Sequence, residues 1–333
     1  MGLAYDPWMH FLLVAALAAG TAPASPLESK LAELAGKSAS TVGLFVHHLE
    51  RGERAGLNAA RPFPMASTFK LPLAVVVLRE MERNELPPLD GKVRLVPADM
   101  FRWASWLWPR MPNGGEVTLQ KALSLLLEGS DNSAANALLR LAGGAKRVRA
   151  ELAALGLDGI SVDRDETEMA LDSVGIAHPT RSEWTWAKFT DATTEVTRKQ
   201  RQAGLERFRN DPRDRATPQA MARVLERIWR GEMLSRPHLA FLRDELALCH
   251  TGPRRLRAGV PPDTLVAHRT GTCPGLGEDD SLCVNDVGVI ALPRGEHVIV
   301  AAFVEDAGGD VDAKEQLIAK LSHAVWEHYA LAR

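Results

Sequence analysis

A serine and a lysine three positions apart, Ser67 and Lys70, give this chain a possible nucleophile with its base. On a helix, residues at this spacing share one face, so the amine can reach the hydroxyl. A serine hydroxyl is a poor nucleophile at neutral pH until a neighbouring base activates it. Two later strings add a second hydroxyl, an amide and a cation: Ser130-Asp131-Asn132 and Arg269-Thr270-Gly271. Together they indicate a serine acyl-transfer enzyme whose substrate carries an amide and a carboxylate.

The residues around these strings predict how they are positioned. Lys70 opens an apolar stretch over residues 71–81 that we expect to be helical. Ser67 would then lie at a helix N-terminus, where unpaired backbone N–H groups favour a developing anion. Ser130-Asp131-Asn132 could equally cap a helix over residues 133–141, and the capping and catalytic roles are compatible. Arg269 taken alone also fits a strand cation that faces solvent.

Composition sets the class of protein. The 333 residues, 46% hydrophobic and 25% charged, are typical of a soluble globular protein with one large domain or two packed lobes. A net charge of −2 argues against a nucleic-acid or anionic-membrane surface. We therefore expect no nucleic-acid partner and no stable membrane association.

The first residues resemble an export signal. An apolar run over residues 8–19 is too short to span a membrane, and it leads to Ala22-Pro23-Ala24, a small-x-small cleavage site. The preceding residues contain Asp6 and no lysine or arginine, which departs from the usual layout. We predict a cleavable signal peptide over residues 1–24 and a periplasmic or secreted protein; a retained anchor is the alternative.

The pattern of apolar residues predicts an α+β fold. Strands are expected over residues 42–50, 264–272, 284–292 and 297–305, and terminal helices over 27–34 and 313–330. Most segments between the two ends are helical in pattern. The simplest arrangement is an antiparallel sheet of about five strands, flanked by helices, with an inserted all-α lobe. The sheet domain would comprise residues 25–61 plus 246–333, and the helical domain residues 62–245.

Three cysteines are too few for a disulfide scaffold. Cys273 and Cys283 flank a connection between two expected strands, so they could form a disulfide or remain free thiols. Cys249 would be left over. None has a neighbouring His/Cys pattern typical of zinc, and we expect neither a metal nor a cofactor.

Taken together and in this order, the three strings resemble class A β-lactamases, which are related to penicillin-binding proteins. The resemblance extends over nearly the whole mature chain. Two further segments resemble the family in general, Arg164-Asp165-Glu166-Thr167-Glu168 and residues 215–221. The branch that includes several extended-spectrum enzymes is resembled by Thr251-Gly252, Arg255 and residues 285–288.

The resemblance implies roles for individual residues. Ser67 would attack the lactam carbonyl, and either Lys70 or Glu166 acting through a water would take its proton. Ser130 would protonate the departing nitrogen, and Glu166 would activate the water that hydrolyses the acyl-enzyme. The backbone N–H groups of Ser67 and Thr272 would form the oxyanion hole. The implied substrate-binding residues are Asn132, Arg269, Thr270, Gly271, Thr272 and, at the mouth of the site, Trp103.

Four departures from the family pattern are visible. Arg269 replaces the lysine of most members, and Ala170 replaces an asparagine that helps to hold the hydrolytic water. No aspartate follows at the usual place to pair with Arg164, for which Asp172 is the nearest candidate. Residues 183–213 are longer and more charged than usual, and the sequence assigns them no role.

The favoured interpretation is a monomeric serine β-lactamase with β-lactam antibiotics as its small-molecule substrates. One alternative is a penicillin-binding-type D,D-peptidase or transpeptidase, which shares the acylation residues. Another is a β-lactam-binding protein that deacylates slowly. Glu166 favours the hydrolase, because an acyl-serine ester persists unless a base activates water against it.

Overall fold

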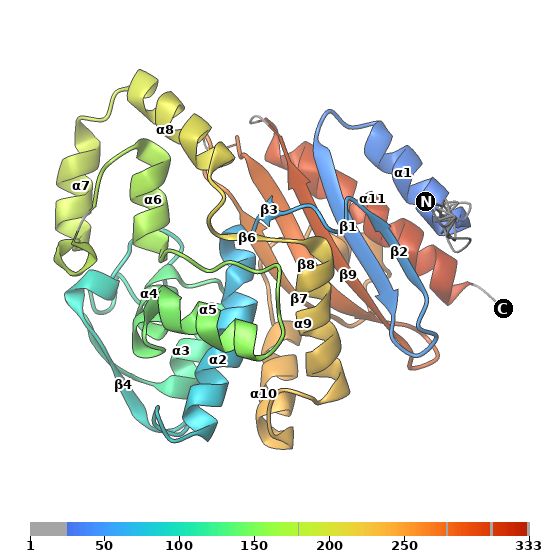
Figure 1. Cartoon of the computed structure of the whole chain (residues 1–333), viewed down its shortest axis with the longest axis horizontal. Helices are drawn as coiled ribbons and strands as arrows, with labels where there is room; N and C mark the ends of the chain where they lie inside the picture. Colours follow the sequence, from blue (N-terminus) through green and yellow to red (C-terminus); the bar gives the residue numbers. More distant parts are fainter. Residues whose placement is uncertain (1–24, 179, 278, 307–308, 332–333) are drawn as a thin grey trace, which may run out of the picture.

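The computed structural model describes residues 25–178, 180–277, 279–306 and 309–331. The signal peptide expected over residues 1–24 lies outside these residues and stays a prediction. The chain folds as a sheet with two helices on one face and a larger, mostly helical region on the other (Figure 1).

One antiparallel sheet joins the two ends of the chain. In spatial order its strands are β2 (Arg54–Leu57), β1 (Thr41–His48), β9 (His297–Glu305), β8 (Cys283–Ala291) and β7 (Val266–Thr272). Short turns connect β1 to β2 and β8 to β9, so these neighbours in sequence pair directly. β7, which carries the Arg269-Thr270-Gly271 string, forms one edge of the sheet.

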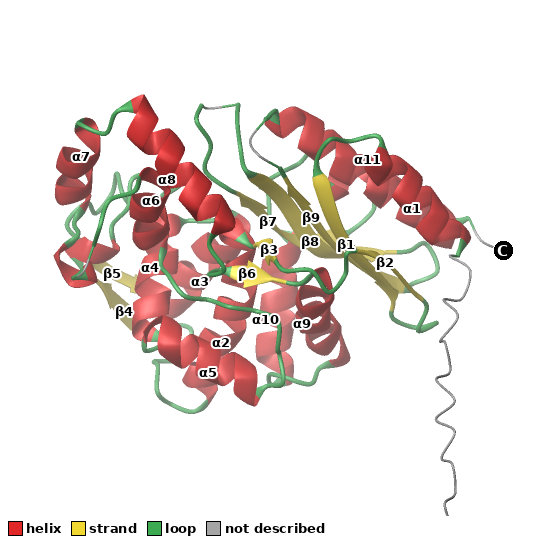
Figure 2. Ribbon diagram, turned by 45° about the horizontal axis from the view of Figure 1, so that its top comes forward, coloured by secondary structure: helices red, strands yellow, loops and turns green. Residues whose placement is uncertain are grey.

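The central strand β9 is apolar on both faces. Its even-numbered side chains, such as Val298 and Val300, pack with α1 (Pro26–Gly36) and α11 (Val311–Ala330). Its odd-numbered side chains, such as Phe303, join the core of the helical region. Burial on both faces explains why β9 is an uninterrupted apolar run without polar alternation. Figure 2 shows α1 and α11 together on one side of the sheet.

The helical region packs around α2 (Lys70–Glu82), which is buried along nearly its whole length. The other helices of this region are α3 (Leu119–Glu128), α4 (Asn132–Leu141), α5 (Gly144–Ala154), α6 (Glu166–Val174), α7 (Trp186–Thr194), α8 (Arg198–Asn210), α9 (Pro218–Arg230) and α10 (Arg236–Ala247). Lys70 is the first residue of α2, so the apolar packing of this helix fixes the position of its amine.

The α+β fold class with an antiparallel five-stranded sheet is confirmed. The inserted region also contains short two-stranded ladders that the sequence did not indicate. They are β3 (Phe63–Pro64) with β6 (Arg215–Ala216), and β4 (Lys92–Leu95) with β5 (Gly115–Thr118). The domain boundaries at residues 61/62 and 245/246 stay predictions.

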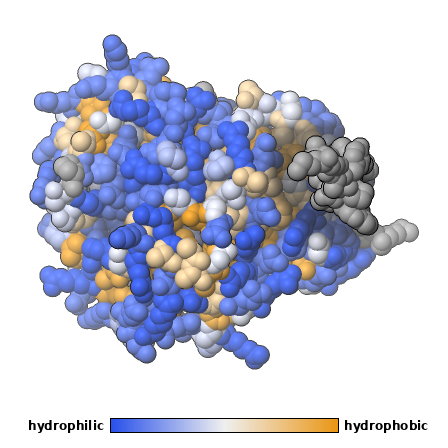
Figure 3. Space-filling model, viewed as in Figure 1, coloured by the Kyte–Doolittle hydropathy of each residue, from blue (hydrophilic) through white to orange (hydrophobic). Residues whose placement is uncertain are grey.

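The face of the molecule in Figure 3 is mainly hydrophilic, and apolar side chains gather on it in small separate groups. Large apolar side chains that are exposed include Trp103, Trp106 and Leu265. Across the described ranges, no helix combines the length and the apolar character needed to cross a membrane.

The segment to which the sequence assigned no role is a helical excursion between α6 and α9. Its second helix, α8, packs closely against the C-terminal end of α6 at Gly204. A Cβ atom at this glycine would lie 2.6 Å from the carbonyl oxygen of Ser173 and 2.8 Å from the backbone nitrogen of Gly175. Backbone atoms cannot move aside as a flexible side chain can. The missing side chain at Gly204 therefore allows α8 to dock on the helix that carries Glu166.

We predict that Gly204→Ala lowers the free energy of unfolding. Overpacking costs about 1–3 kcal/mol, which exceeds the roughly 1 kcal/mol that alanine gains over glycine in a helix. Equilibrium denaturation measures the difference. The control is Gln202→Ala, at an exposed position of the same helix, which should change stability by less than about 0.5 kcal/mol. Equal stabilities for the two variants would contradict the close contact between α8 and α6.

Candidate active site

Ser67 lies in a short 3₁₀ turn, Ala66–Phe69, that runs directly into α2. The sequence predicted a helix N-terminus at this place, and the structure shows the tighter turn immediately before the α-helix. One turn later, the Nζ atom of Lys70 lies 3.1 Å from Ser67 Oγ. The expected pairing of hydroxyl and amine is therefore present in the geometry.

The amine of Lys70 joins segments that are far apart in sequence. It lies 3.0 Å from Ser130 Oγ, 2.5 Å from Asn132 Oδ1 and 2.7 Å from Glu166 Oε1. The side chain has no exposed surface. Burial lowers the pKa of Lys70 to about 8; the carboxylate of Glu166 opposes this shift, and the positive charge of Arg269 adds to it.

Glu166 is the first residue of α6, and its carboxylate reaches the nucleophile. The hydroxyl of Ser67 donates to Glu166 Oε1 at 3.4 Å. The backbone N–H of Glu166 donates to Asn136 Oδ1 at 2.9 Å, a contact that sequence reasoning missed. Glu168 instead accepts the backbone N–H of Asp165 at 2.9 Å and so completes a capping box. Of these two acids, Glu166 is the one within reach of Ser67.

Two residues beside the site hold a left-handed backbone conformation that is uncommon outside glycine. Ala66 precedes the nucleophile with φ of 45°, and Ser130 has φ of 62°. Such conformations persist only where surrounding contacts hold them, and they concentrate at functional sites. At Ser130, both the carbonyl oxygen and the hydroxyl meet Lys70, which accounts for the unusual conformation.

The end of β7 lies against the turn that holds Ser67. A Cβ atom on Gly271 would be 2.5 Å from the carbonyl oxygen of Met65, so glycine permits this close approach. Cys273 donates its N–H to Cys283 on β8 at 2.9 Å. Alternate N–H groups of a strand point in opposite directions, so the N–H of Thr272 points away from β8, toward the open edge of the sheet.

Two arginines contact threonine hydroxyls at or beside β7. Arg255 Nη2 donates to Thr272 Oγ1 at 2.6 Å, and Arg269 Nη1 lies 3.3 Å from the hydroxyl of Thr251. That hydroxyl in turn lies 2.5 Å from Thr270 Oγ1. Arg269 is completely buried, which differs from the usual solvent-facing cation of a strand. The guanidinium in contact with Thr272 is that of Arg255, a residue that the sequence singled out only through the family resemblance.

A cavity of about 160 Å³ opens beside Ser67. It is lined by Ala66, Ser67, Phe101, Trp103, Asn132, Glu166, Met169, Ala170, Ser173, Phe208, Thr272, Cys273 and Pro274. Trp103 lies half exposed at the edge of the cavity, and its backbone carbonyl accepts a hydrogen bond from Asn132 Nδ2 at 3.1 Å. The centroid of the Trp103 indole lies 5.4 Å from the centroid of the Phe101 ring and 5.5 Å from that of the Trp186 indole on α7. Trp103 is thus both a wall residue and part of an aromatic cluster.

The excursion supplies part of the cavity wall. Phe208 of α8 lines the cavity, and Leu205 of the same helix packs against Cys273 and Cys283. These two cysteines form a disulfide, with Cα atoms 4.9 Å apart, so the alternative of free thiols is wrong in this structure. Cys249 is free and buried. No local sequence signal could have placed Phe208 here, because its position depends on how α8 docks.

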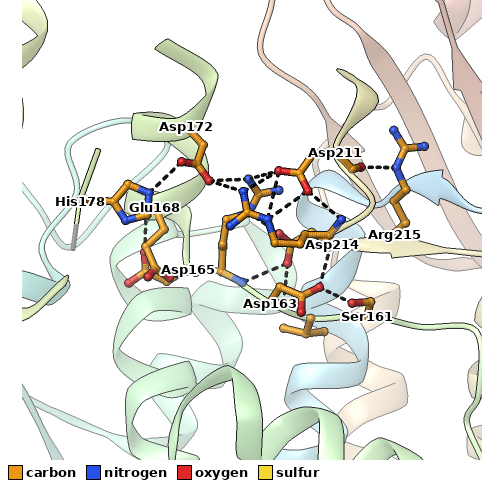
Figure 4. A network of polar contacts seen from close by, with 12 residues as sticks. Ser161, Asp163, Asp165, Glu168, Asp172, His178, Asp211, Asp214 and Arg215 are labelled. Atoms are coloured by element: carbon orange, nitrogen blue, oxygen red, sulfur yellow. Dashed lines mark hydrogen bonds and ion pairs between the residues drawn. The ribbon is translucent and has the colours of Figure 1, made fainter. Parts of the chain in front are cut away.

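Arg164 closes the loop that carries Glu166. Its buried guanidinium pairs with Asp172 at 2.7 Å, as expected, and also with Asp214 at 2.6 Å and Asp211 at 3.2 Å. Figure 4 shows these three carboxylates converging between α6 and the end of the excursion. Asp214 also accepts the backbone N–H of Arg164 at 3.1 Å. Arg164 and Asp214 are 50 positions apart in the sequence, which explains why the sequence did not indicate this pair.

Fold and site together define a serine hydrolase with an α+β architecture. The family model described as "Beta-lactamase enzyme family" matches residues 26–329, and the chain belongs to this family. Its curated relatives and structural neighbours place it in class A, and it is a β-lactam hydrolase. Among the residues that the structure describes, no group of three or more candidate ligands could hold a metal ion.

Two relatives from Pseudomonas aeruginosa illustrate the similarity. The chain is 26% identical to beta-lactamase VEB-1, covering 86% of this chain and 85% of that protein. It is 27% identical to extended-spectrum beta-lactamase PER-1, covering 92% and 89%. Among solved structures, TLA-3 extended-spectrum beta-lactamase aligns with a TM-score of 0.75 at 26% identity, over 91% of this chain and 98% of that one.

We predict that Arg164→Met destabilises the fold strongly, because it leaves three partly or fully buried carboxylates without their shared cation. Loss of one partner from such a buried cluster costs about 3–5 kcal/mol. The control is Arg213→Ala, a half-exposed arginine that also pairs with Asp172 and Asp211 and should cost less than about 1 kcal/mol. Denaturant unfolding compares the variants. Similar losses for both would show that burial of Arg164 does not matter.

Proposed function

We propose that the chain hydrolyses β-lactams through an acyl-enzyme on Ser67 that a water activated by Glu166 releases. The observation that carries the proposal is the placement of Ser67 Oγ within hydrogen-bond reach of two candidate bases. Lys70 Nζ lies 3.1 Å from it and Glu166 Oε1 lies 3.4 Å from it. A nucleophile with a base within hydrogen-bond reach is the arrangement that acyl transfer requires.

In the first step, Ser67 Oγ attacks the lactam carbonyl carbon while its proton passes to a base. The buried amine of Lys70 is available as a base once it is neutral, and the carboxylate of Glu166 is the other candidate. The ring C–N bond then breaks, and the nitrogen takes a proton from the hydroxyl of Ser130. That hydroxyl contacts Lys70 at 3.0 Å, so the proton lost by Ser67 can return through the amine.

Backbone and side chains at the sheet edge would bind the substrate. The outward N–H of Thr272 and the N–H of Ser67 suit a developing oxyanion, because preorganised donors need no rearrangement during the reaction. Asn132 would bond the side-chain amide of the substrate, with Trp103 at the rim of the cavity. Arg269 would attract the carboxylate, with support from Thr270, Thr272 and Arg255. The absence of a side chain at Gly271 would let the edge strand approach the turn that holds Ser67.

Hydrolysis of the ester requires a water with a base on its far side. Glu166 is the candidate because its carboxylate borders the same cavity as Ser67. Ala170 also lines this cavity and offers no side-chain hydrogen bond to the water. Glu166 would therefore position the water without help from residue 170. The alternative functions are those of a D,D-peptidase or of a slowly deacylating binding protein, and intact mass distinguishes them from hydrolysis.

The remaining parts of the proposal concern the setting. We propose a monomer, exported to the periplasm or beyond with the help of residues 1–24 and acting on β-lactam antibiotics without a nucleic-acid partner. The disulfide between Cys273 and Cys283 supports an oxidising compartment.

Intact mass after mixing with a penicillin tests the two chemical steps. Ser67→Ala should form no adduct. Glu166→Ala should acylate and then stall with the adduct in place, because loss of a general base costs about 100- to 10,000-fold in rate. Glu168→Ala is the matched control from the same helix and should turn over. An adduct on Ser67→Ala, or fast turnover by Glu166→Ala, would contradict the mechanism; a persistent adduct on the unaltered enzyme would favour the alternatives.

The pH dependence of acylation identifies its base. If neutral Lys70 takes the proton, the acylation rate should rise about tenfold per pH unit and level off above a pH of about 8. In Glu166→Gln the same limb should move to lower pH, because Glu166 raises the pKa of Lys70. Rapid-mixing measurements of the acylation rate follow both enzymes. A rate that is flat between about pH 6 and 9 in the unaltered enzyme would assign the proton to Glu166 instead.

A further inference from the structure

Arg269 is a buried cation, and no carboxylate of the described residues lies at ion-pair distance from it; Glu166 and Asp286 act on it only from farther away. Its Nη1 atom lies 3.4 Å from the carbonyl oxygen of Leu127 and 3.3 Å from the hydroxyl of Thr251, both uncharged. Its Nε and Nη2 atoms have no hydrogen-bond partner within the described residues. A buried lysine can lose its proton, whereas an arginine stays charged in proteins. A buried charge without a partner is costly, so an anion is expected nearby.

The ionisable group in contact with this guanidinium is the free thiol of Cys249. Its Sγ atom lies 3.7 Å from Arg269 Nη1 and 3.3 Å from Thr251 Oγ1. Cys249 follows α10 and is almost completely buried. Sulfur at this distance is within hydrogen-bond range of a guanidinium, and a thiolate would supply the missing negative charge.

His268 and Asp286 form a buried pair that acts electrostatically on the thiol. They occupy the paired strands β7 and β8, and His268 Nδ1 lies 2.9 Å from Asp286 Oδ1. Burial alone lowers the pKa of His268, but the carboxylate of Asp286, together with the sulfur of Cys249, outweighs burial and raises it to about 10. The protonated imidazole and the thiolate therefore stabilise each other.

The charged groups near the thiol come from several elements. His268 and Arg269 belong to β7, and Asp286 belongs to β8. Arg257 contacts Cys249 at its backbone carbonyl oxygen, at 3.4 Å, and not at its thiol. Burial by itself raises the pKa of the Cys249 thiol, yet His268 and the charge of Arg269 bring it down to about 6.

We propose that Cys249 is a thiolate that serves as the counter-ion of Arg269 and so positions this cation in the proposed β-lactamase site. Cys249 does not touch the substrate in this proposal; it acts through Arg269. The proposal rests on the proposed function for the role of Arg269, whereas its first test needs no substrate.

The ultraviolet absorbance of the thiolate tests the ionisation state directly. The other two cysteines of the chain form the disulfide, so the difference between the unaltered protein and Cys249→Ser reports Cys249 alone. We expect thiolate absorbance at neutral pH that disappears only as the pH falls through about 6. Absorbance that develops only near the ordinary thiol pKa of about 8.5 would overturn the proposal.

The same titration tests whether Arg269 is the partner. Arg269→Gln should raise the pH midpoint by roughly one unit or more, because it removes the adjacent positive charge. Arg254→Ala is the control: this exposed arginine pairs with Asp312 and Glu315 on α11 and should leave the midpoint unchanged. Circular dichroism establishes that each variant is folded. An unchanged midpoint in folded Arg269→Gln would show that the thiol is not paired with this cation.

An isosteric pair of variants separates charge from packing. Cys249→Asp keeps a negative charge at this position and Cys249→Asn does not, although the two side chains have the same shape. For a carboxylate-bearing penicillin, we expect Cys249→Asp to retain roughly 10-fold higher kcat/KM than Cys249→Asn. Equal values, or a higher value for Cys249→Asn, would overturn the positioning role. Failure of the proposed function would instead appear as unchanged penicillin hydrolysis by Ser67→Ala, whatever the thiol titration gives.

Discussion

The arrangement of the site depends on the contacts that the buried ammonium group of Lys70 makes. It meets Ser67, Ser130, Asn132 and Glu166, which belong to separate segments of the chain. A buried amine needs acceptors around it, so any displacement of one segment leaves a polar group unsatisfied. The apolar packing of α2 fixes the amine, and the other segments converge on it.

Glu166 reaches this amine only because its loop is held from both ends. At its start, Arg164 binds carboxylates on both sides of the excursion, including Asp214 where the chain returns to the core. Along its length, α8 lies on α6 at Gly204 and contacts the disulfide-linked end of the sheet through Leu205. The long insertion therefore connects the helix that carries Glu166 with the strand that carries Thr272. The geometry of Glu166 relative to Ser67 depends on this connection.

The sequence predicted the parts of the site that depend on local spacing. Ser67 and Lys70 share a face because three residues separate them, and β9 stands out because burial on both faces makes it continuously apolar. Contacts between distant segments came only from the family resemblance, and several of them were missed. Asp214 gives no sign that it pairs with Arg164, Arg255 gives none that it reaches Thr272, and Phe208 lines the cavity only because α8 docks there. Such contacts follow from packing, which residue types and spacing do not determine.

Lys70 and Arg269 are buried cations of the site, and the chemistry of each side chain determines how its charge is tolerated. Lys70 can respond to burial through its pKa, which falls to about 8, and the resulting neutral amine is useful as a base. Arg269 has no such response, because guanidinium keeps its proton. Its charge must be balanced from outside, by an anion of the protein or by the carboxylate of a bound substrate. A lysine at position 269 would not impose this requirement so strictly. The proposed thiolate of Cys249, which contacts the guanidinium of Arg269, meets this requirement from within the protein.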